Sequence, residues 1–302
     1  MDSLAILIGG PTASGKTNLA FEIAQQIPSI IINADSMQTY DNLKLLTNQP
    51  TENQIKEFDC KLFGFIKYPN SSNVALWGKK VKQILFNNQN KVPIFVGGSG
   101  MYLNSIINEI SEIPNVNLKV RRKVRNIQKK YGNKFLYEKL ITKSKEYDGR
   151  LQINDTQRII RATEVQISTG KPIFNWFRNR KNNAFKNILY VVLKLERAEL
   201  YQRINKRCER MIELGLISEI EEFVRRNIIE DDHPLLKAIG FNIFQKYLIS
   251  KINFDSSINN FKKETRRYAK RQITWFKNRS SSAKQLDYLN AKNYILENLN
   301  KN

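Results

Sequence analysis

A glycine-rich stretch near the N-terminus has the residue types and spacing of a phosphate-binding loop. Residues 9–18, GGPTASGKTN, follow the pattern G-x-x-x-x-G-K-T. The apolar run LAILI precedes this stretch and the helical pattern LAFEIAQQI follows it. Strand, turn and helix in that order are the context in which such a loop holds a polyphosphate, so a chance glycine turn is the weaker interpretation.

Each part of this loop could contact phosphate. Glycines let the backbone curl so that successive N–H groups point inward, and a helix from about Lys16 adds the positive end of its dipole. Lys16 supplies a cation, and the Thr17 hydroxyl is placed to hold a magnesium ion. The expected phosphate-binding residues are Gly10, Pro11, Thr12, Ala13, Ser14, Gly15, Lys16 and Thr17.

Two further turns could contribute to the same site. Asp35 follows the apolar run at 29–33, and ligands of open α/β sheets bind beyond the carboxyl ends of the strands. Asp35 is therefore a candidate general base, with a simple turn-forming role as the open alternative. The run PIFV at 93–96 ends in GGSG, with Ser99 in place of the Asp that would hold magnesium in an ATPase or simple kinase.

The elements that position these turns form an α/β pattern. Apolar runs at 4–8, 29–33, 93–96 and 188–195 are typical of buried parallel strands, and helical patterns lie between them at 17–27 and 74–88. We therefore expect a P-loop-type parallel-sheet core. Further helical patterns at 197–214, 217–226, 235–249 and 258–277 predict a helical C-terminal part.

The pattern changes between residues 115 and 182. The run KVRRKVRNIQKK carries seven basic residues in positions 119–130, and helical segments follow without a strong strand. We expect a helical insertion at 115–182 in a core formed by 1–114 and 183–302.

Positive charge dominates the composition. Fifty Lys and Arg against 28 Asp and Glu give a net charge of +22, which favours a polyanionic partner. General compositional bias would scatter this charge, but it gathers at 119–130 and 262–279. In the second cluster the rows Lys263, Arg267, Arg271 and Lys262, Arg266, Lys270 recur every four residues on a helix, where neighbouring acids are too few to neutralise them. Tyr268 and Trp275 are expected to pack on the core.

Other features point to a cytoplasmic protein. No run of about 18 apolar residues and no signal peptide is present, so no membrane partner is expected. Cys60 and Cys208 are far apart and His233 is the single histidine, which argues against a zinc site.

Together these motifs resemble the tRNA dimethylallyltransferase family, in its bacterial form without a zinc finger. The matching segments, in chain order from residue 9 to about 277, are GGPTASGKT at 9–17, ADSMQTY at 34–40, VGGSGMY at 96–102, NDTQRIIRATEV at 154–165, TGKP at 169–172 and RRYAKRQITWF at 266–276. The chain departs from the family pattern at LTNQP (46–50), CKL (60–62) and GFN (240–242).

The resemblance implies a reaction and roles for residues. The loop would hold dimethylallyl diphosphate with Mg²⁺ on Thr17, and N6 of the adenine on the 3′ side of the tRNA anticodon would attack the prenyl group. Asp35 would accept the amine proton, Lys16 and Thr17 would stabilise the leaving diphosphate, and Ser99 would help to seat the flipped adenine. Arg203 and Arg207 resemble arginines near the diphosphate, with an exposed helix face as the alternative. The residues expected to face tRNA are Asp35, Ser36, Met37, Gln38, Ser99, Arg121, Gln157, Arg158, Ile159, Ile160 and Arg161.

Other functions share parts of this pattern. An adenylate isopentenyltransferase acting on AMP, ADP or ATP is disfavoured by the basic insertion, which a free nucleotide does not need. A P-loop kinase is disfavoured by the missing strand-end Asp. A non-catalytic P-loop RNA-binding protein is disfavoured by the intact Lys16, Thr17 and Asp35. No protein partner is implied, so we expect a monomer.

The cluster at 119–130 generates a first prediction. Replacing Arg121, Arg122 and Arg125 with Ala should weaken tRNA binding. It should also reduce the slope of log affinity against log salt concentration by about two units, because each neutralised phosphate contributes roughly 0.7–0.9 to that slope. Binding of the prenyl donor should hardly change. A salt titration of wild type and triple variant measures this, and parallel lines would assign these arginines to a solvated face.

Overall fold

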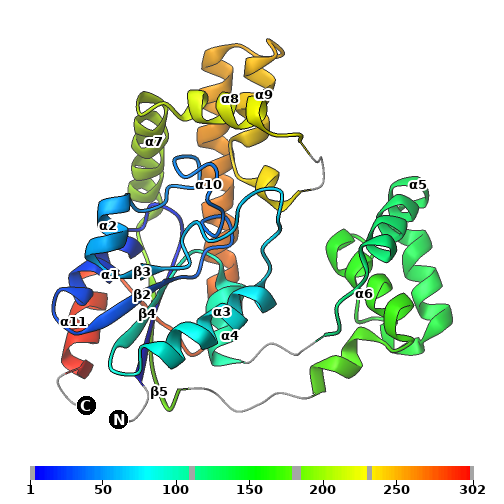
Figure 1. Ribbon diagram of the computed structural model, residues 1–302, viewed down its shortest axis with the longest axis horizontal. Coiled ribbons are helices and arrows are strands. Elements are labelled where there is room, and N and C mark those ends of the chain that lie inside the picture. The colour runs from blue at the N-terminus through cyan, green and yellow to red at the C-terminus, as the bar shows by residue number, and fades with distance from the viewer. Residues whose placement is uncertain (1–3, 109–112, 179–184, 230–232, 300–302) are drawn as a thin grey trace. The chain divides into compact units, whose positions relative to one another are not determined.

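The computed structural model describes residues 4–108, 113–178, 185–229 and 233–299. The chain forms two compact units, Met1–Ile107 with Asn183–Asn302, and Asn108–Asn182 (Figure 1). The second unit therefore begins at 108, whereas the change of sequence pattern suggests 115.

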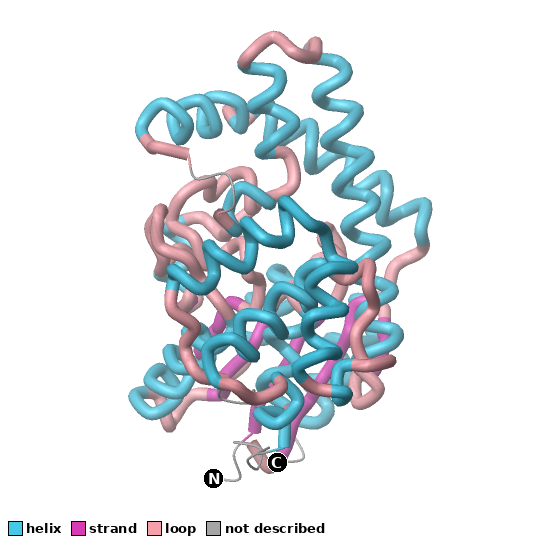
Figure 2. The backbone as a smooth tube through the Cα atoms, turned by 90° about the vertical axis from the view of Figure 1, so that its right-hand side faces the viewer, coloured by secondary structure: helices cyan, strands magenta, loops and turns pink. Residues whose placement is uncertain are grey.

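A six-stranded parallel sheet forms the centre of the first unit (Figure 2). The four expected strands are β1 (Leu4–Gly9), β2 (Ser29–Asn33), β4 (Val92–Val96) and β5 (Asn187–Leu193). Two short edge strands, β3 (Cys60–Lys61) and β6 (Lys284–Leu286), complete the order β3-β2-β4-β1-β5-β6. The predicted α/β class with a P-loop-type parallel core is confirmed.

Helices cover both faces of this sheet, which is why its central strands are apolar throughout. On one face, Leu7, Ile32 and Phe95 pack with residues of α3 (Val74–Asn87), α4 (Gly100–Ile107) and α10 (Phe254–Arg279). On the other face, Ile8 and Ile31 pack with α1 (Lys16–Ala24), α11 (Tyr288–Leu299) and the short α2 (Glu52–Glu57).

The C-terminal helices build an apolar core of their own. Helices α7 (Arg197–Glu213), α8 (Leu216–Arg226) and α9 (Phe241–Leu248) pack with α10 around Ile204, Ile220 and Phe261. The predicted continuous helix at 235–249 is wrong. A 3₁₀ turn at Pro234–Lys237 precedes α9, and the chain breaks between them because Gly240 has a φ of 103°, outside the helical region.

Helix α10 presses closely against two glycine-rich turns. A Cβ on Gly100 would lie 1.9 Å from the Trp275 ring, and a Cβ on Gly9 would lie 2.8 Å from the Phe276 ring. Neither aromatic ring could keep its place beside a larger residue. These glycines therefore allow α10 to pack directly against the two turns.

The second unit is helical, as expected. Helix α5 (Leu118–Lys143), kinked at Gly132, packs on α6 (Thr156–Thr169) around Val124, Leu140 and Val165. Short 3₁₀ turns lie at Lys145–Tyr147 and Ile173–Arg178. Across both units, none of the described helices is long and apolar enough to cross a membrane.

The packing of α10 predicts a contrast between two glycines. Gly100→Ala should destabilise the protein by about 1–3 kcal/mol, because the new methyl group overlaps Trp275. Gly78→Ala is the matched control, since nothing lies within 4 Å of its added Cβ in α3. It should stabilise the protein by about 0.5–1 kcal/mol through lower backbone entropy of the unfolded chain. Urea denaturation measures both, and equal effects would contradict the close packing.

Candidate active site

The register of the sheet brings the three chemically interesting turns to one edge. Val96 at the end of β4 is level with Ile8 of β1 and with Asn33 of β2. The glycine-rich loop, the Asp35 turn and the Gly97–Gly100 turn begin within one or two residues of these positions. They therefore converge at the carboxyl end of the sheet, as the sequence pattern predicts.

The glycine-rich loop has the backbone of an anion-binding nest. Ala13 and Gly15 have positive φ values of 64° and 92°, and α1 begins at Lys16. Gly15 is the N-cap and supplies no side chain to the first-turn amides, which also have no acidic neighbour in that turn. Unpartnered amides and the helix dipole together favour an anion here. The Lys16 ammonium donates to the Pro11 carbonyl at 2.7 Å.

A cavity of about 770 Å³ opens over this loop. That volume falls within the usual range of roughly 300–1,000 Å³ for small-molecule sites. The loop, the Asp35 turn, α7 and α10 all contribute to its wall. The predicted site residues that line it are Thr12, Ala13, Gly15, Lys16, Thr17, Asp35, Ser36, Met37, Gln38, Arg203 and Arg207.

Positive charge surrounds the cavity. Its lining contains the cations Lys16, Arg203, Lys206, Arg207, Arg210, Lys237 and Arg271, and Asp35 is the only carboxylate among the described lining residues. Loss of hydration lowers the pKa of the Lys16 ammonium to about 8, with Asp35 opposing the shift and Arg207 adding to it. The free site thus holds more positive charge than its own carboxylate can balance.

The two predicted arginines of α7 differ in their surroundings. Arg203 is exposed and pairs with Glu199 at 2.7 Å. Arg207, one turn later, has a buried Nε with no hydrogen-bond partner in the described part of the chain, and desolvation lowers its pKa. A buried donor without a partner favours a ligand acceptor at that point. Arg207 is therefore the better placed of the two for an anion in the cavity.

Asp35 forms its turn and also lines the cavity. Its Oδ1 accepts the Met37 N–H at 3.0 Å, and its own N–H donates to Asn33 Oδ1 at 2.8 Å. These bonds form the turn. The carboxylate nevertheless lines the cavity and interacts electrostatically with Lys16 and Arg207. The turn thus fixes a carboxylate within the site.

Ser99 has a different position from the one expected for a residue that seats the acceptor. Its Oγ accepts the Ser36 N–H at 3.0 Å and lies 3.3 Å from Ser36 Oγ. It is not among the described residues that line the cavity. Its hydroxyl is instead occupied in joining the β4 turn to the Asp35 turn.

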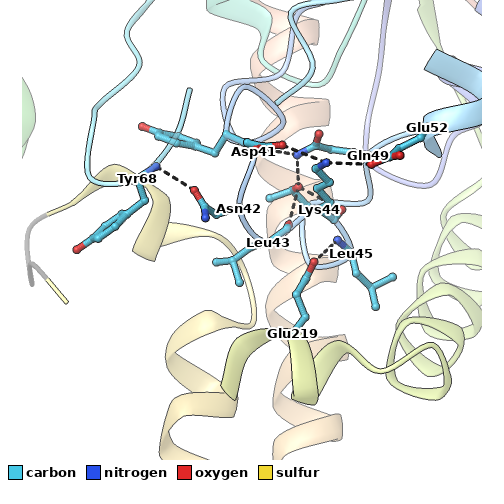
Figure 3. Close-up of polar contacts among 11 residues, drawn as sticks. Asp41, Asn42, Leu43, Lys44, Leu45, Gln49, Glu52, Tyr68 and Glu219 are labelled. Carbon is cyan, nitrogen blue, oxygen red and sulfur yellow. Dashed lines mark hydrogen bonds and ion pairs between the residues drawn. The ribbon is translucent and has the colours of Figure 1, made fainter. Parts of the chain in front are cut away.

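The loop at 41–50, which includes the departure from the family pattern at 46–50, is held by a half-buried carboxylate. Glu219 on α8 accepts the N–H group of Leu45 at 2.7 Å (Figure 3). It also accepts the N–H group of Leu46 at 2.9 Å, and partial burial raises its pKa. Gln38 reinforces the loop by donating to the carbonyls of Thr47 and Asn48 at 3.0 and 2.8 Å. Leu46, Thr47 and Asn48 in turn line the cavity.

Helix α10 contributes more than the predicted basic rows. Two of those cations are neutralised, because Lys262 pairs with Glu209 at 2.5 Å and Arg267 with Glu264 at 2.6 Å. The expectation that acids are too few is wrong for these two. Sequence reasoning also missed Gln272, which lies within the motif RRYAKRQITWF. Its amide bonds to both the phosphate loop and the β4 turn.

In the second unit, the predicted tRNA-facing residues have mixed surroundings. Gln157 is exposed and Arg158 pairs with Asp155 at 3.3 Å, whereas Ile160 and Arg161 are half-buried. The side chain of Ile159 is fully buried in the apolar core of this unit. Arg121 is also half-buried.

Known proteins resemble this chain along nearly its whole length. The IPP transferase family profile matches residues 38–279, and the isopentenyl transferase profile matches residues 4–62. The tRNA dimethylallyltransferase of Pelagibacter ubique (strain HTCC1062) is 38% identical over 299 residues, 97% of this chain and 94% of that protein. That of Wolbachia pipientis wMel is 36% identical over 295 residues, 96% of this chain and 97% of the relative.

Solved structures share the fold. The full-length tRNA isopentenylpyrophosphate transferase from Bacillus halodurans superposes with a TM-score of 0.69 at 27% identity, covering 100% of this chain and 98% of the other. A eukaryotic dimethylallyltransferase, captured in crystallographic snapshots acting on tRNA, gives a TM-score of 0.80 at 24% identity, covering 95% and 74% of the two chains.

The lowered pKa of Lys16 predicts how anion affinity depends on pH. In the free protein, Lys16 loses its proton as pH rises through about 8. A bound anion stabilises the charged ammonium and so keeps Lys16 protonated to higher pH. The affinity of wild type for methylenediphosphonate, relative to Lys16→Met, should therefore fall up to tenfold per pH unit above that pKa. Isothermal titration calorimetry from pH 7 to 9.5 measures the ratio of the wild-type affinity to the Lys16→Met affinity. Proton loss from the ligand affects both proteins equally, so it cancels in this ratio. A ratio independent of pH would contradict the role of Lys16.

Proposed function

Because the chain belongs to the IPP transferase family, we propose that it transfers a dimethylallyl group from dimethylallyl diphosphate to N6 of the adenine 3′-adjacent to the anticodon in tRNA. The observation that carries this proposal is a cavity whose described lining brings together a phosphate loop, several cations and the carboxylate of Asp35.

The phosphate loop supports the departure of the diphosphate. As the adenine N6 lone pair forms its bond to C1 of the prenyl group, the C1–O bond breaks and negative charge grows on the leaving oxygen. The loop amides, the Lys16 ammonium and the unpartnered Arg207 Nε are fixed donors around this charge. Fixed donors of this kind stabilise a transition state without reorganising.

Asp35 supports removal of the proton from the attacking amine. It is the one described carboxylate of the cavity wall, and its backbone is fixed by the turn. The proton passes from N6 to an Asp35 carboxylate oxygen as the new C–N bond forms.

The donor set of the cavity also fits Mg²⁺. Within the described ranges there is no cluster of three or more His, Cys, Asp or Glu that would hold a metal by protein ligands alone. Mg²⁺ is commonly held by one or two protein oxygens and the phosphates of its substrate. Thr17, with Asp35 nearby in the lining, offers such oxygens. When bound, the ion would supply positive charge to the diphosphate.

The acceptor distinguishes this proposal from the adenylate alternative. The insertion carries seven basic residues in positions 119–130, of which Arg122 and Lys123 are exposed. Such a surface suits a polynucleotide, and phosphate contacts can offset the few kcal/mol needed to flip a base. We also propose that the protein acts as a monomer in the cytoplasm.

A labelling experiment tests the acceptor. The protein is incubated with radiolabelled dimethylallyl diphosphate and Mg²⁺, with either unmodified tRNA or AMP as acceptor. Label should appear in tRNA, and nuclease digestion should place it on the adenine next to the anticodon. Labelled AMP with unlabelled tRNA would favour the adenylate isopentenyltransferase, and no labelled product would favour a non-catalytic RNA-binding protein.

The substitution Asp35→Ala tests the proposed role of Asp35 as the general base. Prenyl transfer to tRNA should slow by about 10²–10⁴-fold, the usual contribution of a general base. Affinity for tRNA should stay within a few-fold, since the variant keeps the basic surfaces. Single-turnover rates and filter binding measure the two quantities. Turnover near the wild-type rate would show that Asp35 only shapes its turn.

A further inference from the structure

We propose that Gln272 is a positioning residue, whose side-chain amide holds the phosphate loop and the turn of the catalytic base in their working relation. This inference rests on the proposed function, because it concerns the two halves of the same reaction. Gln272 lies on α10, far in sequence from either turn that it contacts.

The Gln272 amide uses both of its ends. Its Oε1 accepts the Thr12 N–H of the phosphate loop at 2.8 Å, and its Nε2 donates to the Gly98 carbonyl at 3.0 Å. The side chain is buried, with 5% of its surface exposed. A Cβ on Gly98 would lie 2.1 Å from Gln272 Nε2, so this position accepts only glycine while the amide keeps its place.

The contact continues to the catalytic base. Gly98 precedes Ser99, whose Oγ accepts the Ser36 N–H at 3.0 Å, and Ser36 follows Asp35 in the chain. The path from Thr12 to Asp35 thus consists of hydrogen bonds and two short backbone segments. A displaced Gln272 would allow the leaving-group site and the base to move relative to each other.

The chemistry of the bridge selects an amide. The bridge needs an acceptor for Thr12 and a donor for Gly98 on one planar group, and glutamine supplies both. Methionine keeps similar length and volume but supplies neither bond. Ionised glutamate keeps the acceptor for Thr12, but it places a second oxygen against the Gly98 carbonyl, where no hydrogen bond can form. Protonated glutamate again has one donor and one acceptor, so it should replace glutamine.

This role predicts an effect on kcat. Thr12 gives its N–H to Gln272, which leaves the remaining loop amides to hold the diphosphate. Loss of the bridge therefore need not weaken binding of either substrate. It should instead misalign the attacking amine, the prenyl carbon and Asp35, and a misplacement of about 1 Å can cost about 10²-fold in rate.

The experiment compares Gln272→Met and Gln272→Glu with the matched controls Gln202→Met and Gln202→Glu on the exposed surface of α7. Steady-state kinetics with dimethylallyl diphosphate and tRNA are measured from pH 5.5 to 8.5. Gln272→Met should lower kcat by about 30–100-fold with both KM values within about threefold. Gln272→Glu should be similarly slow at pH 8.5, and its rate relative to wild type should rise as pH falls and the carboxyl gains its proton. The controls should match wild type throughout.

Three outcomes would overturn the proposal. A change confined to KM for tRNA would make Gln272 a direct RNA contact. Wild-type kcat in Gln272→Met would show that the bridge is unnecessary. A ratio of Gln272→Glu to wild type that does not change with pH would show that only packing matters. Failure of the proposed function is distinguishable, because it would appear as the absence of prenyl transfer to tRNA by wild type itself.

Discussion

Mutual repulsion among the cations of one cavity is the constraint on which the rest of the structure depends. Like charges gathered in a partly desolvated space raise the free energy of the folded chain. Desolvation is the main cause of the lowered pKa of Lys16, and repulsion from Arg207 adds to it. The protein can hold such a site only if other interactions fix it firmly. A multivalent anion that enters relieves the repulsion, so the same strain favours substrate binding.

The fold meets this constraint with apolar packing beside each charged element. On α7, Leu200 and Ile204 are buried in the apolar core, and each stands three residues before an arginine, Arg203 or Arg207, that lines the cavity. The phosphate loop follows β1, whose residues 5–8 are fully buried between helices on both faces of the sheet. The cations are thus attached to well-packed elements, which hold them in place against their mutual repulsion.

The sequence predicts those parts whose signal is local, and misses those that depend on distant packing. The strands that support the phosphate loop and Asp35 are continuous apolar runs with β-branched residues, so their positions are evident. The edge strands CK and KQL are too short for such a pattern, and the break at Gly240 depends on its backbone angle. Ile159 lies inside a motif but faces the core, and the bonds of Gln272 join residues more than 170 positions apart. Motif membership alone therefore does not distinguish a residue that touches a ligand from one that supports the fold.

The contact of Glu219 with the loop at 41–50 limits which substitutions the loop can accept. Glu219 holds the N–H groups of Leu45 and Leu46, and every amino acid except proline provides such a group. Other contacts of the loop depend on its side chains, because Leu46 is buried in the apolar core and Gln49 donates to the Tyr40 carbonyl. Proline at 45 or 46 would therefore remove a bond to Glu219 through the backbone itself, whereas other changes at 46 and 49 would act through the side chain.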